Sequence, residues 1–343
     1  MIDLRSDTFT KPSSAMKEAM LNADVGDDVW GEDPTVNRLQ RMIAELFGKE
    51  ESLFVPSGTM ANQIGILINT EQGDEVICES ESHIFFYETA GPAILSKVQL
   101  RPLPSQRGEI PISEIEKAIR PDVYYFPKTS LICLENTHNR HGGAILSLNY
   151  IKKVRKLADT YNLRLHLDGA RIWNAMARTG ISAVEYASYF DTIQVCLSKG
   201  MGAPVGSLIM GIKEDMQKAL KWRKILGGGM RQAGFLAAAG IFALDNHIQL
   251  MADDNQKALI FAGIISKSPK IELKLSEVES NMVTFKLTQD VSADSFVEKC
   301  KKEKILLIHI GENKIRTVFH LDISEGEAIT AGNKIIEICK KFY

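Results

Sequence analysis

Two ionisable residues, Asp168 and Lys199, each stand at the end of an apolar run typical of a buried strand. In α/β proteins, the groups that bind ligands gather beyond the carboxyl ends of such strands. A lysine that is shielded from water can form a Schiff base with a carbonyl compound, and a carboxylate can balance a positive ring nitrogen. Taken alone, each residue also fits a simpler interpretation, a solvated lysine and a turn aspartate.

Three small residues, Ser57, Gly58 and Thr59, lie between an apolar run and the start of a helical pattern. The free N–H groups of a helix N-terminus bind phosphate, and Gly58 lets the backbone come close to it. A simple helix cap is the alternative. His83 follows another apolar run and could stack on an aromatic ligand, or it could be a hydrogen-bonded structural histidine.

The elements that must position these residues alternate along the first 246 residues. Helical spacing of apolar residues and short apolar runs take turns, which predicts an α/β fold with a mostly parallel sheet covered by helices. After residue 246 the pattern changes to short strands and helices. We therefore predict a large domain of residues 1–246 and a smaller α+β domain of residues 247–343. The predicted strands are 53–55, 75–78, 131–134, 164–167, 192–197, 205–210, 280–287, 305–310 and 314–319, and the predicted helices are 35–48, 59–68, 147–161, 293–302 and 326–342.

Composition excludes several classes of protein. The 41 basic and 43 acidic residues give a net charge of −2, so there is no basic excess to hold nucleic acid. The first residues carry acids and no apolar run, which argues against a signal peptide. No apolar stretch reaches the roughly 20 residues that span a bilayer. Five scattered cysteines without a Cys-x-x-Cys pair predict buried thiols in a reducing compartment, and hence a cytoplasmic protein.

A pair of histidines, His138 and His141, raises the question of a metal site. In the sequence no acid or cysteine completes a ligand set with them, so we interpret both as loop histidines and expect no metal.

The order phosphate cradle, stacking ring, aspartate, lysine is the chain order of the aspartate-aminotransferase-like (fold type I) enzymes that use pyridoxal phosphate (PLP). More closely, the chain resembles the low-specificity L-threonine aldolases. The resemblance covers the large domain almost end to end and is thinner in the small one. It rests on residues 4–8 (LRSDT), 25–34 (VGDDVWGEDP), 56–62 (PSGTMAN), 135–139 (ENTHN), 166–171 (HLDGAR), 197–200 (LSKG), 227–234 (GGGMRQAG) and 314–318 (KIRTV).

The resemblance implies a role for each residue of the cofactor site. Lys199 would bind PLP covalently, Asp168 would pair with the pyridine nitrogen, and His83 would stack on the ring. The phosphate would lie on Ser57, Gly58 and Thr59. Arg171 would lie near the phenolic oxygen of the ring and the substrate carboxylate.

The resemblance also implies a substrate site and an assembly. Ser6 and Arg316 would hold the substrate carboxylate, Arg316 through a bidentate fork. Lys224 and Arg231 flank the turn of three glycines, and in similar enzymes this segment borders a neighbour's active site. A homo-oligomer is therefore expected, at least a dimer and preferably a tetramer.

Two residues depart from the pattern of the family. Trp30 stands where relatives commonly have tyrosine, and Tyr125 stands where many have a histidine near the substrate hydroxyl. If both line the side-chain pocket, discrimination at Cβ should be weak, because one hydrogen bond to a neutral group is worth only about 0.5–1.5 kcal/mol. We expect both L-threonine and L-allo-threonine to be cleaved to glycine and an aldehyde.

The expected reaction is a retro-aldol cleavage in which a base removes the β-hydroxyl proton. His83 is the best candidate, acting directly or through a water molecule. A β-elimination or a transamination remains the alternative enzyme activity, because the cofactor carries most of the chemistry. A non-catalytic binding module of the same fold is a further alternative, against which the intact Lys199, Asp168 and Arg171 argue.

Overall fold

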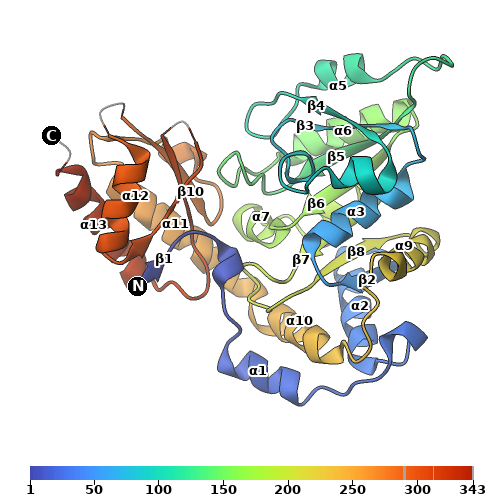
Figure 1. Cartoon of the computed structure of the whole chain (residues 1–343), viewed down its shortest axis with the longest axis horizontal. Helices are drawn as coiled ribbons and strands as arrows, with labels where there is room; N and C mark the ends of the chain where they lie inside the picture. Colours follow the sequence, from blue (N-terminus) through green and yellow to red (C-terminus); the bar gives the residue numbers. More distant parts are fainter. Residues whose placement is uncertain (289–290, 312, 342–343) are drawn as a thin grey trace.

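The computed structural model describes residues 1–288, 291–311 and 313–341. The chain forms two lobes (Figure 1), a larger one built on a seven-stranded sheet and a smaller one that contains both ends of the chain. Helix α11 (Met251–Ile265) packs against α13 (Glu325–Cys339) of the smaller lobe and against α7 (Ile172–Thr179) of the larger, and so joins the two.

The central sheet has the strand order β2-β8-β7-β6-β5-β3-β4. Strand β8 is antiparallel to both of its neighbours, and the other pairs are parallel. The predicted α/β class with a mostly parallel sheet is thereby confirmed. The strands are β2 (Glu51–Val55), β3 (Glu75–Glu79), β4 (Gln99–Leu103), β5 (Thr129–Glu135), β6 (Arg164–Gly169), β7 (Thr192–Cys196) and β8 (Ser207–Gly211).

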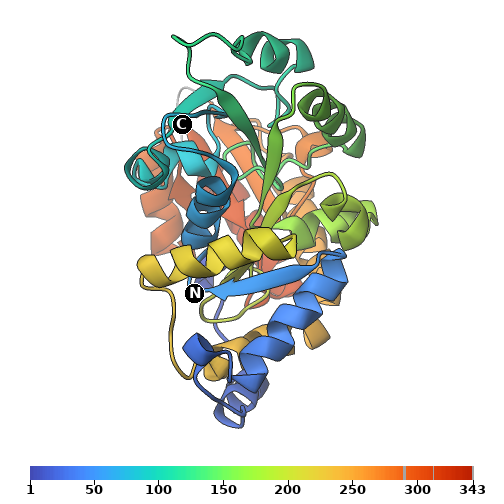
Figure 2. The same ribbon diagram turned by 90° about the vertical axis from the view of Figure 1, so that its right-hand side faces the viewer.

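The two faces of this sheet are covered by different helices. Alternate residues of a strand point to opposite faces, so Phe54 packs in the cluster with α2 and α6, whereas Leu53 and Val55 pack in the cluster with α3 and α9. Figure 2 shows α9 lying alongside β2. The helices of this lobe are α1 (Ser14–Leu21), α2 (Pro34–Phe47), α3 (Gly58–Asn69), α4 (His83–Phe86), α5 (Ile112–Ala118), α6 (Leu148–Thr160), α7, α8 (Ala183–Ala187), α9 (Lys213–Ile225) and α10 (Gly234–Asn246).

Helix α2 illustrates how local sequence sets these elements. The side chain of Asp33 accepts hydrogen bonds from the first N–H groups of the helix, and Pro34 occupies the first position, where its missing N–H is not needed. Gly48 ends the helix at φ 62°, a left-handed conformation that glycine adopts without strain. The apolar side chains recur at helical spacing on the buried face, at Val36, Leu39, Ile43 and Phe47.

The smaller lobe contains a four-stranded antiparallel sheet of order β12-β13-β10-β9. The predicted strand 305–310 is broken into β11 and β12, and β11 pairs in parallel with the N-terminal strand β1. The first residues thus belong to the smaller lobe, whereas the predicted boundary at residue 246 assigns them to the large domain. The predicted division into two domains stays a proposal. The elements are β1 (Ile2–Asp3), β9 (Ile271–Glu272), β10 (Met282–Leu287), α12 (Ala293–Lys302), β11 (Ile305–Leu306), β12 (Ile308–His309), β13 (Lys314–Val318) and α13.

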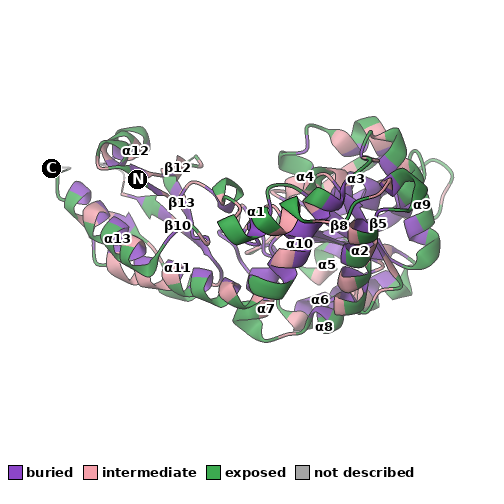
Figure 3. Cartoon of the chain, turned by 90° about the horizontal axis from the view of Figure 1, so that it is seen from below, coloured by how far each residue is buried: buried purple, intermediate pink, exposed green. Residues whose placement is uncertain are grey.

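The distribution of burial agrees with these layers. Figure 3 shows buried strands inside and exposed outer faces on the helices. All five cysteines are buried free thiols, as predicted. Within the described residues, no single helix is long and apolar enough to cross a bilayer. The segments Gly234–Asn246 and Ile248–Ile265, bent by 58° to one another, meet those criteria only as a pair.

Candidate active site

The residues predicted for catalysis converge because the strands before them are parallel. Strands β2, β3, β5, β6 and β7 all end at the same edge of the sheet. A cleft of about 420 Å³ opens at this edge, and both lobes contribute to its walls. Its lining includes Ser6, His83, Asn139, Arg171, Lys199 and Arg316.

Asp168 lies buried at the end of β6, where side-chain amides fix its carboxylate. Asn62 Nδ2 donates to Oδ2 at 2.8 Å, and the amide of Gln194 donates to Oδ1. Burial by itself raises the pKa of this carboxyl. The charges of His83 and Lys199 and the Asn62 hydrogen bond outweigh burial and hold the pKa below its usual value. Asp168 is therefore a fixed negative charge beside the cleft.

His83 opens helix α4 and is oriented by a buried acid, Glu88. The Nδ1 atom of His83 lies 2.7 Å from Glu88 Oε1, and Glu88 also accepts from Asn62 Nδ2 at 2.8 Å and from Gln63 Nε2 at 2.5 Å. Because an ionised carboxylate only accepts hydrogen bonds, the proton of a neutral His83 lies on Nδ1 and Nε2 is left as a base. Burial lowers the pKa of His83, but the hydrogen bond to Glu88 and nearby carboxylates raise it above its usual value.

Lys199 follows β7 in a tight turn. The N–H of Gly202, at φ 76°, donates to the carbonyl of Lys199 at 2.8 Å. This turn directs the half-buried lysine side chain to the cleft. Its charge favours the ionised form of Asp168, which shows that the two groups share one electrostatic environment.

Arg171 forms a buried ion pair with Asp7, a residue that the sequence offered only as part of a motif. Its Nε and Nη2 atoms each donate to one oxygen of Asp7, both at 2.6 Å. Burial raises the pKa of Asp7, but the charge and hydrogen bonds of Arg171 reverse this and bring the pKa to about 2. Because its fork is occupied by Asp7, a contact of Arg171 with a substrate carboxylate stays a prediction that depends on its remaining N–H groups.

Arg316 enters the cleft from β13 and still has an unused donor. Its Nη1 donates to Asn139 Oδ1 at 2.8 Å, whereas its Nε is buried and has no hydrogen-bond partner among the described residues. Burial and the neighbouring charge of Arg171 lower the pKa of Arg316. A buried donor without a partner costs about 1–3 kcal/mol. Arg316 is therefore well placed to bind an anion, and Ser6 lines the same cleft.

The predicted phosphate cradle forms the N-terminus of α3. Ser57 caps the helix, and its Oγ accepts the N–H of Met60 at 3.2 Å. The first N–H groups of a helix have no partner inside it, and Ser57 and Thr59 are exposed. Asn62, one turn further along, reaches Asp168, so cradle and carboxylate belong to one site. Phosphate binding at this end of α3 stays a prediction.

Three predicted residues, Trp30, Lys224 and Arg231, lie outside the cleft of their own chain. All are exposed, and Trp30 is 77% exposed. They nevertheless lie near the start of α3, because Arg223, which precedes Lys224, links the segment around Trp30 to the end of β2. Its guanidinium contacts Asp28 at 2.9 Å and donates to a carbonyl of β2 at 2.9 Å. Their predicted roles in cofactor and substrate binding stay predictions.

The structure does not bring Tyr125 to the cleft of its own chain. Tyr125 precedes β5, whereas the cleft lies beyond the other end of that strand, at Glu135. A strand of this length, at roughly 3.3 Å per residue, separates the two edges of the sheet by about 20 Å. Tyr125 is 65% exposed. A contact with substrate would need the cleft of a neighbouring copy, and stays a prediction.

Four residues that shape the site had no spacing pattern that pointed to them. They are Asn62, Glu88, Asn139 and Gln194. Each is a buried polar residue on an element that is otherwise apolar or follows a strand. Asn62 and Asn139 lie in motifs of the resemblance, whereas for Glu88 and Gln194 a polar residue at a position that should be buried was the available signal.

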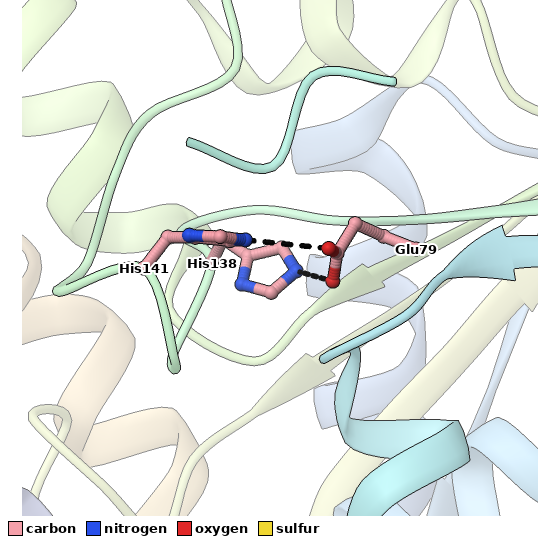
Figure 4. A group of neighbouring side chains, drawn as sticks. All are labelled: Glu79, His138 and His141. Atoms are coloured by element: carbon pink, nitrogen blue, oxygen red, sulfur yellow. Dashed lines mark hydrogen bonds and ion pairs between the residues drawn. The ribbon is translucent and has the colours of Figure 1, made fainter. Parts of the chain in front are cut away.

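The interpretation of His138 and His141 as simple loop histidines is wrong in one respect. An acid does complete their set, because Glu79 at the end of β3 meets both rings (Figure 4). Glu79 is far from them in the sequence, and only the pairing of β3 with β5 brings the three together.

The cleft fits PLP. A buried, ionised Asp168 suits a cationic ring nitrogen, and the amides of Asn62 and Gln194 keep that carboxylate in place. Lys199 would hold the aldehyde carbon and His83 would cover the ring. The donors at the start of α3 would take the phosphate.

Known proteins are similar to this chain over most of its length. The sequence profile of the beta-eliminating lyase family matches residues 3–288. A low-specificity L-threonine aldolase of Escherichia coli (strain K12) is 41% identical over 325 residues, which span 94% of this chain and 95% of that protein. Low-specificity L-threonine aldolase 1 of Arabidopsis thaliana is 40% identical over 332 residues, which span 95% and 93%.

Solved structures agree in fold. A threonine aldolase of Leishmania major superposes with a TM-score of 0.85 at 17% identity, covering 99% of this chain and 100% of that one. Sequence and fold point in the same direction. The chain therefore belongs to the beta-eliminating lyase family of PLP-dependent enzymes, and within it to the low-specificity L-threonine aldolases.

Proposed function

We propose that this protein cleaves L-threonine and L-allo-threonine to glycine and acetaldehyde. The observation that carries the proposal is the convergence of Lys199, His83 and Arg316 on one cleft, with the ionised Asp168 buried beside it. A covalent anchor, a base, an anion-binding fork and a fixed negative charge are the groups that a retro-aldol cleavage of an amino acid needs. Its relatives in Escherichia coli and Arabidopsis thaliana are named for this activity.

Each residue has a separate task. When bound, PLP supplies an electron sink for the Cα–Cβ bond that breaks. Arg316, with its unpaired buried Nε, binds the substrate carboxylate and so orients the amino acid in the cleft. Asp168 would balance the charge of the ring nitrogen, and Lys199 would hold the cofactor between turnovers.

The proton of the β-hydroxyl is the group that must move for the aldehyde to leave. His83 is the base, because Glu88 occupies its Nδ1 atom and leaves Nε2 as the acceptor. The raised pKa of His83 makes it a stronger acceptor than an ordinary histidine. The proton is transferred directly or through one water molecule.

A homo-oligomer, at least a dimer and preferably a tetramer, is part of the proposal. The exposed side chains of two linked segments support it: Trp30 is 77% exposed and Ile225 is 69% exposed, and the ion pairs Arg223–Asp28 and Arg231–Asp27 join the segments that carry them. Large exposed apolar side chains that cluster together mark interaction surfaces. The resemblance to enzymes in which this segment borders a neighbour's active site implies that Lys224 and Arg231 serve the cleft of a second copy.

A cytoplasmic location is likewise proposed. The five buried thiols support it, because a reducing compartment keeps such cysteines unpaired.

Product analysis with L-threonine tests the proposed activity. We expect glycine and acetaldehyde in equal amounts. Formation of ammonia with an α-keto acid would indicate β-elimination. Turnover only in the presence of a second substrate that accepts the amino group would indicate transamination, and no turnover would indicate a binding module. Borohydride reduction followed by peptide mapping tests the anchor: a pyridoxyl adduct on any lysine other than Lys199 would remove that assignment.

A further inference from the structure

At the same edge of the sheet as the cleft, one buried carboxylate and two imidazoles meet (Figure 4). Glu79 ends β3, and His138 and His141 come from the loop after β5. His138 Nε2 lies 2.9 Å from Glu79 Oε2, and His141 Nε2 lies 3.3 Å from Glu79 Oε1. One ligand atom of each residue lies within 4.8 Å of the others.

The spacing of these atoms suits a transition-metal ion. Zinc binds imidazole nitrogen and carboxylate oxygen at about 2.0–2.2 Å, and a tetrahedral arrangement then places neighbouring ligand atoms roughly 3.3 Å apart. The two imidazoles lie 2.9 and 3.3 Å from different oxygens of Glu79, and one ligand atom of each of the three residues lies within 4.8 Å of the others. Two imidazoles and one carboxylate therefore need only small side-chain rotations to hold one ion.

The hydrogen bonding of His138 gives an independent reason. Its side chain is 1% exposed, yet neither ring nitrogen has a hydrogen-bond partner among the described residues. The 2.9 Å approach to Glu79 is thus a close contact and not an in-line hydrogen bond. A buried polar group in this state costs about 1–3 kcal/mol. A metal ion between the ring and the carboxylate would satisfy it.

Glu79 has the supporting contacts that orient a metal ligand. The backbone N–H of Glu81 donates to its Oε2 at 2.6 Å, and Ser105 Oγ donates to its Oε1 at 2.9 Å. Ser105 Oγ also lies 3.2 Å from His141 Nε2, within reach as a fourth ligand.

An ion can also reach this group from solvent. His141 lines a second cleft of about 380 Å³ together with Arg107 and Arg140. Both guanidiniums are paired with acids, Arg107 with Glu279 at 2.8 Å and Arg140 with Glu81 at 2.8 Å. The mouth is therefore not a field of unpaired positive charge that would repel a cation.

We propose that Glu79, His138 and His141 bind a divalent ion of the zinc class, which joins the segment after β3 to the loop after β5. Both segments lead into the cleft. The first continues into His83, and the second carries Asn139, whose Oδ1 accepts from Arg316. None of the three ligands lines the cleft around Lys199, so the ion acts as a structural clamp.

Zinc retention by the holoenzyme tests this proposal. Tag-free protein is treated with EDTA, incubated with ZnCl₂, desalted and analysed for metal. We expect one zinc per chain in the wild type and in the control His309→Ala, which removes an exposed histidine paired with Asp294 at 3.2 Å. In His141→Ala we expect at least about tenfold weaker binding. Equal zinc content in wild type and His141→Ala would overturn the proposal.

X-ray absorption of the zinc-loaded wild type provides a second measurement that needs no variant. We expect two imidazole nitrogens with oxygen in the first shell, and an unchanged visible band of the cofactor. A shell of oxygens alone, or zinc bound at the cofactor, would rule the site out even if His141→Ala failed to fold.

Discussion

Two carboxylates lie with histidines at one edge of the central sheet, and they differ in the other side chains that they contact. In the cleft, Glu88 holds His83 and accepts from the side-chain amides of Asn62 and Gln63. At the end of β3, Glu79 meets two histidine rings.

The two groups therefore differ in what they can do. Glu88 with its amide donors holds a histidine in place, whereas Glu79 with two imidazoles can also bind a metal ion. An amide nitrogen donates a hydrogen bond but has no lone pair for a metal. A neutral imidazole has one, and it either carries a proton or coordinates an ion. The amide-rich pair is therefore suited to face an organic substrate and cofactor, and the histidine-rich pair is suited to exchange protons for a metal ion.

The largest effect is expected where a fixed charge next to the cofactor is removed. Asp168→Asn keeps the size of the side chain and loses the negative charge, so kcat for L-threonine should fall about 10²–10³-fold, with weaker cofactor retention. Circular dichroism should show an intact fold. Turnover close to that of the wild type would end the argument that this carboxylate supports the ring nitrogen.

A third buried carboxylate, Asp254, extends the comparison because its hydrogen bonding is incomplete. Lys257 donates to its Oδ1 at 2.8 Å, but Oδ2 has no partner among the described residues. Burial, against the attraction of Lys257, raises its pKa from 3.8 to about 6. The folded state thus binds this proton more tightly than the unfolded state, and its stability falls as pH rises from about 4 through 6.

In Asp254→Asn, this fall in stability with rising pH should be absent, because an amide does not ionise. The stability of the variant relative to the wild type should increase between pH 4 and pH 7 by up to about 3 kcal/mol. Melting temperatures of both proteins across this range measure it. A difference that does not change with pH would mean that Asp254 is already ionised without penalty.

A smaller effect is expected when Glu88 loses its charge. In Glu88→Gln, the amide can still contact His83, but the pKa of His83 should fall because a negative charge has gone. We expect kcat to fall about tenfold and the acidic limb of kcat/KM to move to lower pH. Glu114→Gln, which removes the charge of an exposed carboxylate paired with Lys117 at 2.8 Å away from the cleft, is the matched control. A lower rate with an unmoved acidic limb would reduce Glu88 to a packing role.

The smallest effect is expected for the stabilisation of the protein by zinc at Glu79, His138 and His141. Zinc at five times its dissociation constant should stabilise the wild type by about 1 kcal/mol, since an ion that binds only the folded state adds RT ln(1 + [L]/Kd). The melting temperature should rise by about 1–2 °C in the wild type and by much less in His141→Ala. An equal rise in both proteins would place the ion elsewhere.

Local sequence determined the elements and most of the cleft. Apolar spacing and caps located α2, α3 and α6, and the apolar runs located six of the seven strands of the central sheet, because these signals act over a few residues. Strand β4 was not predicted, because its residues form no buried apolar run. Lys199, Asp168 and His83 were candidates because each follows a strand and parallel strands end at one edge, and the resemblance to the threonine aldolases then implied their roles.

Tertiary structure alone decided which distant groups meet. Asp7 and Arg171 are 164 residues apart and form a bidentate pair, and Glu79 reaches His138 only because β3 pairs with β5. The position of Tyr125 before β5 set it at the opposite edge from the cleft of its own chain. Spacing along a chain specifies which face of an element a residue occupies, whereas contacts between elements follow from strand order and packing, which no local pattern records.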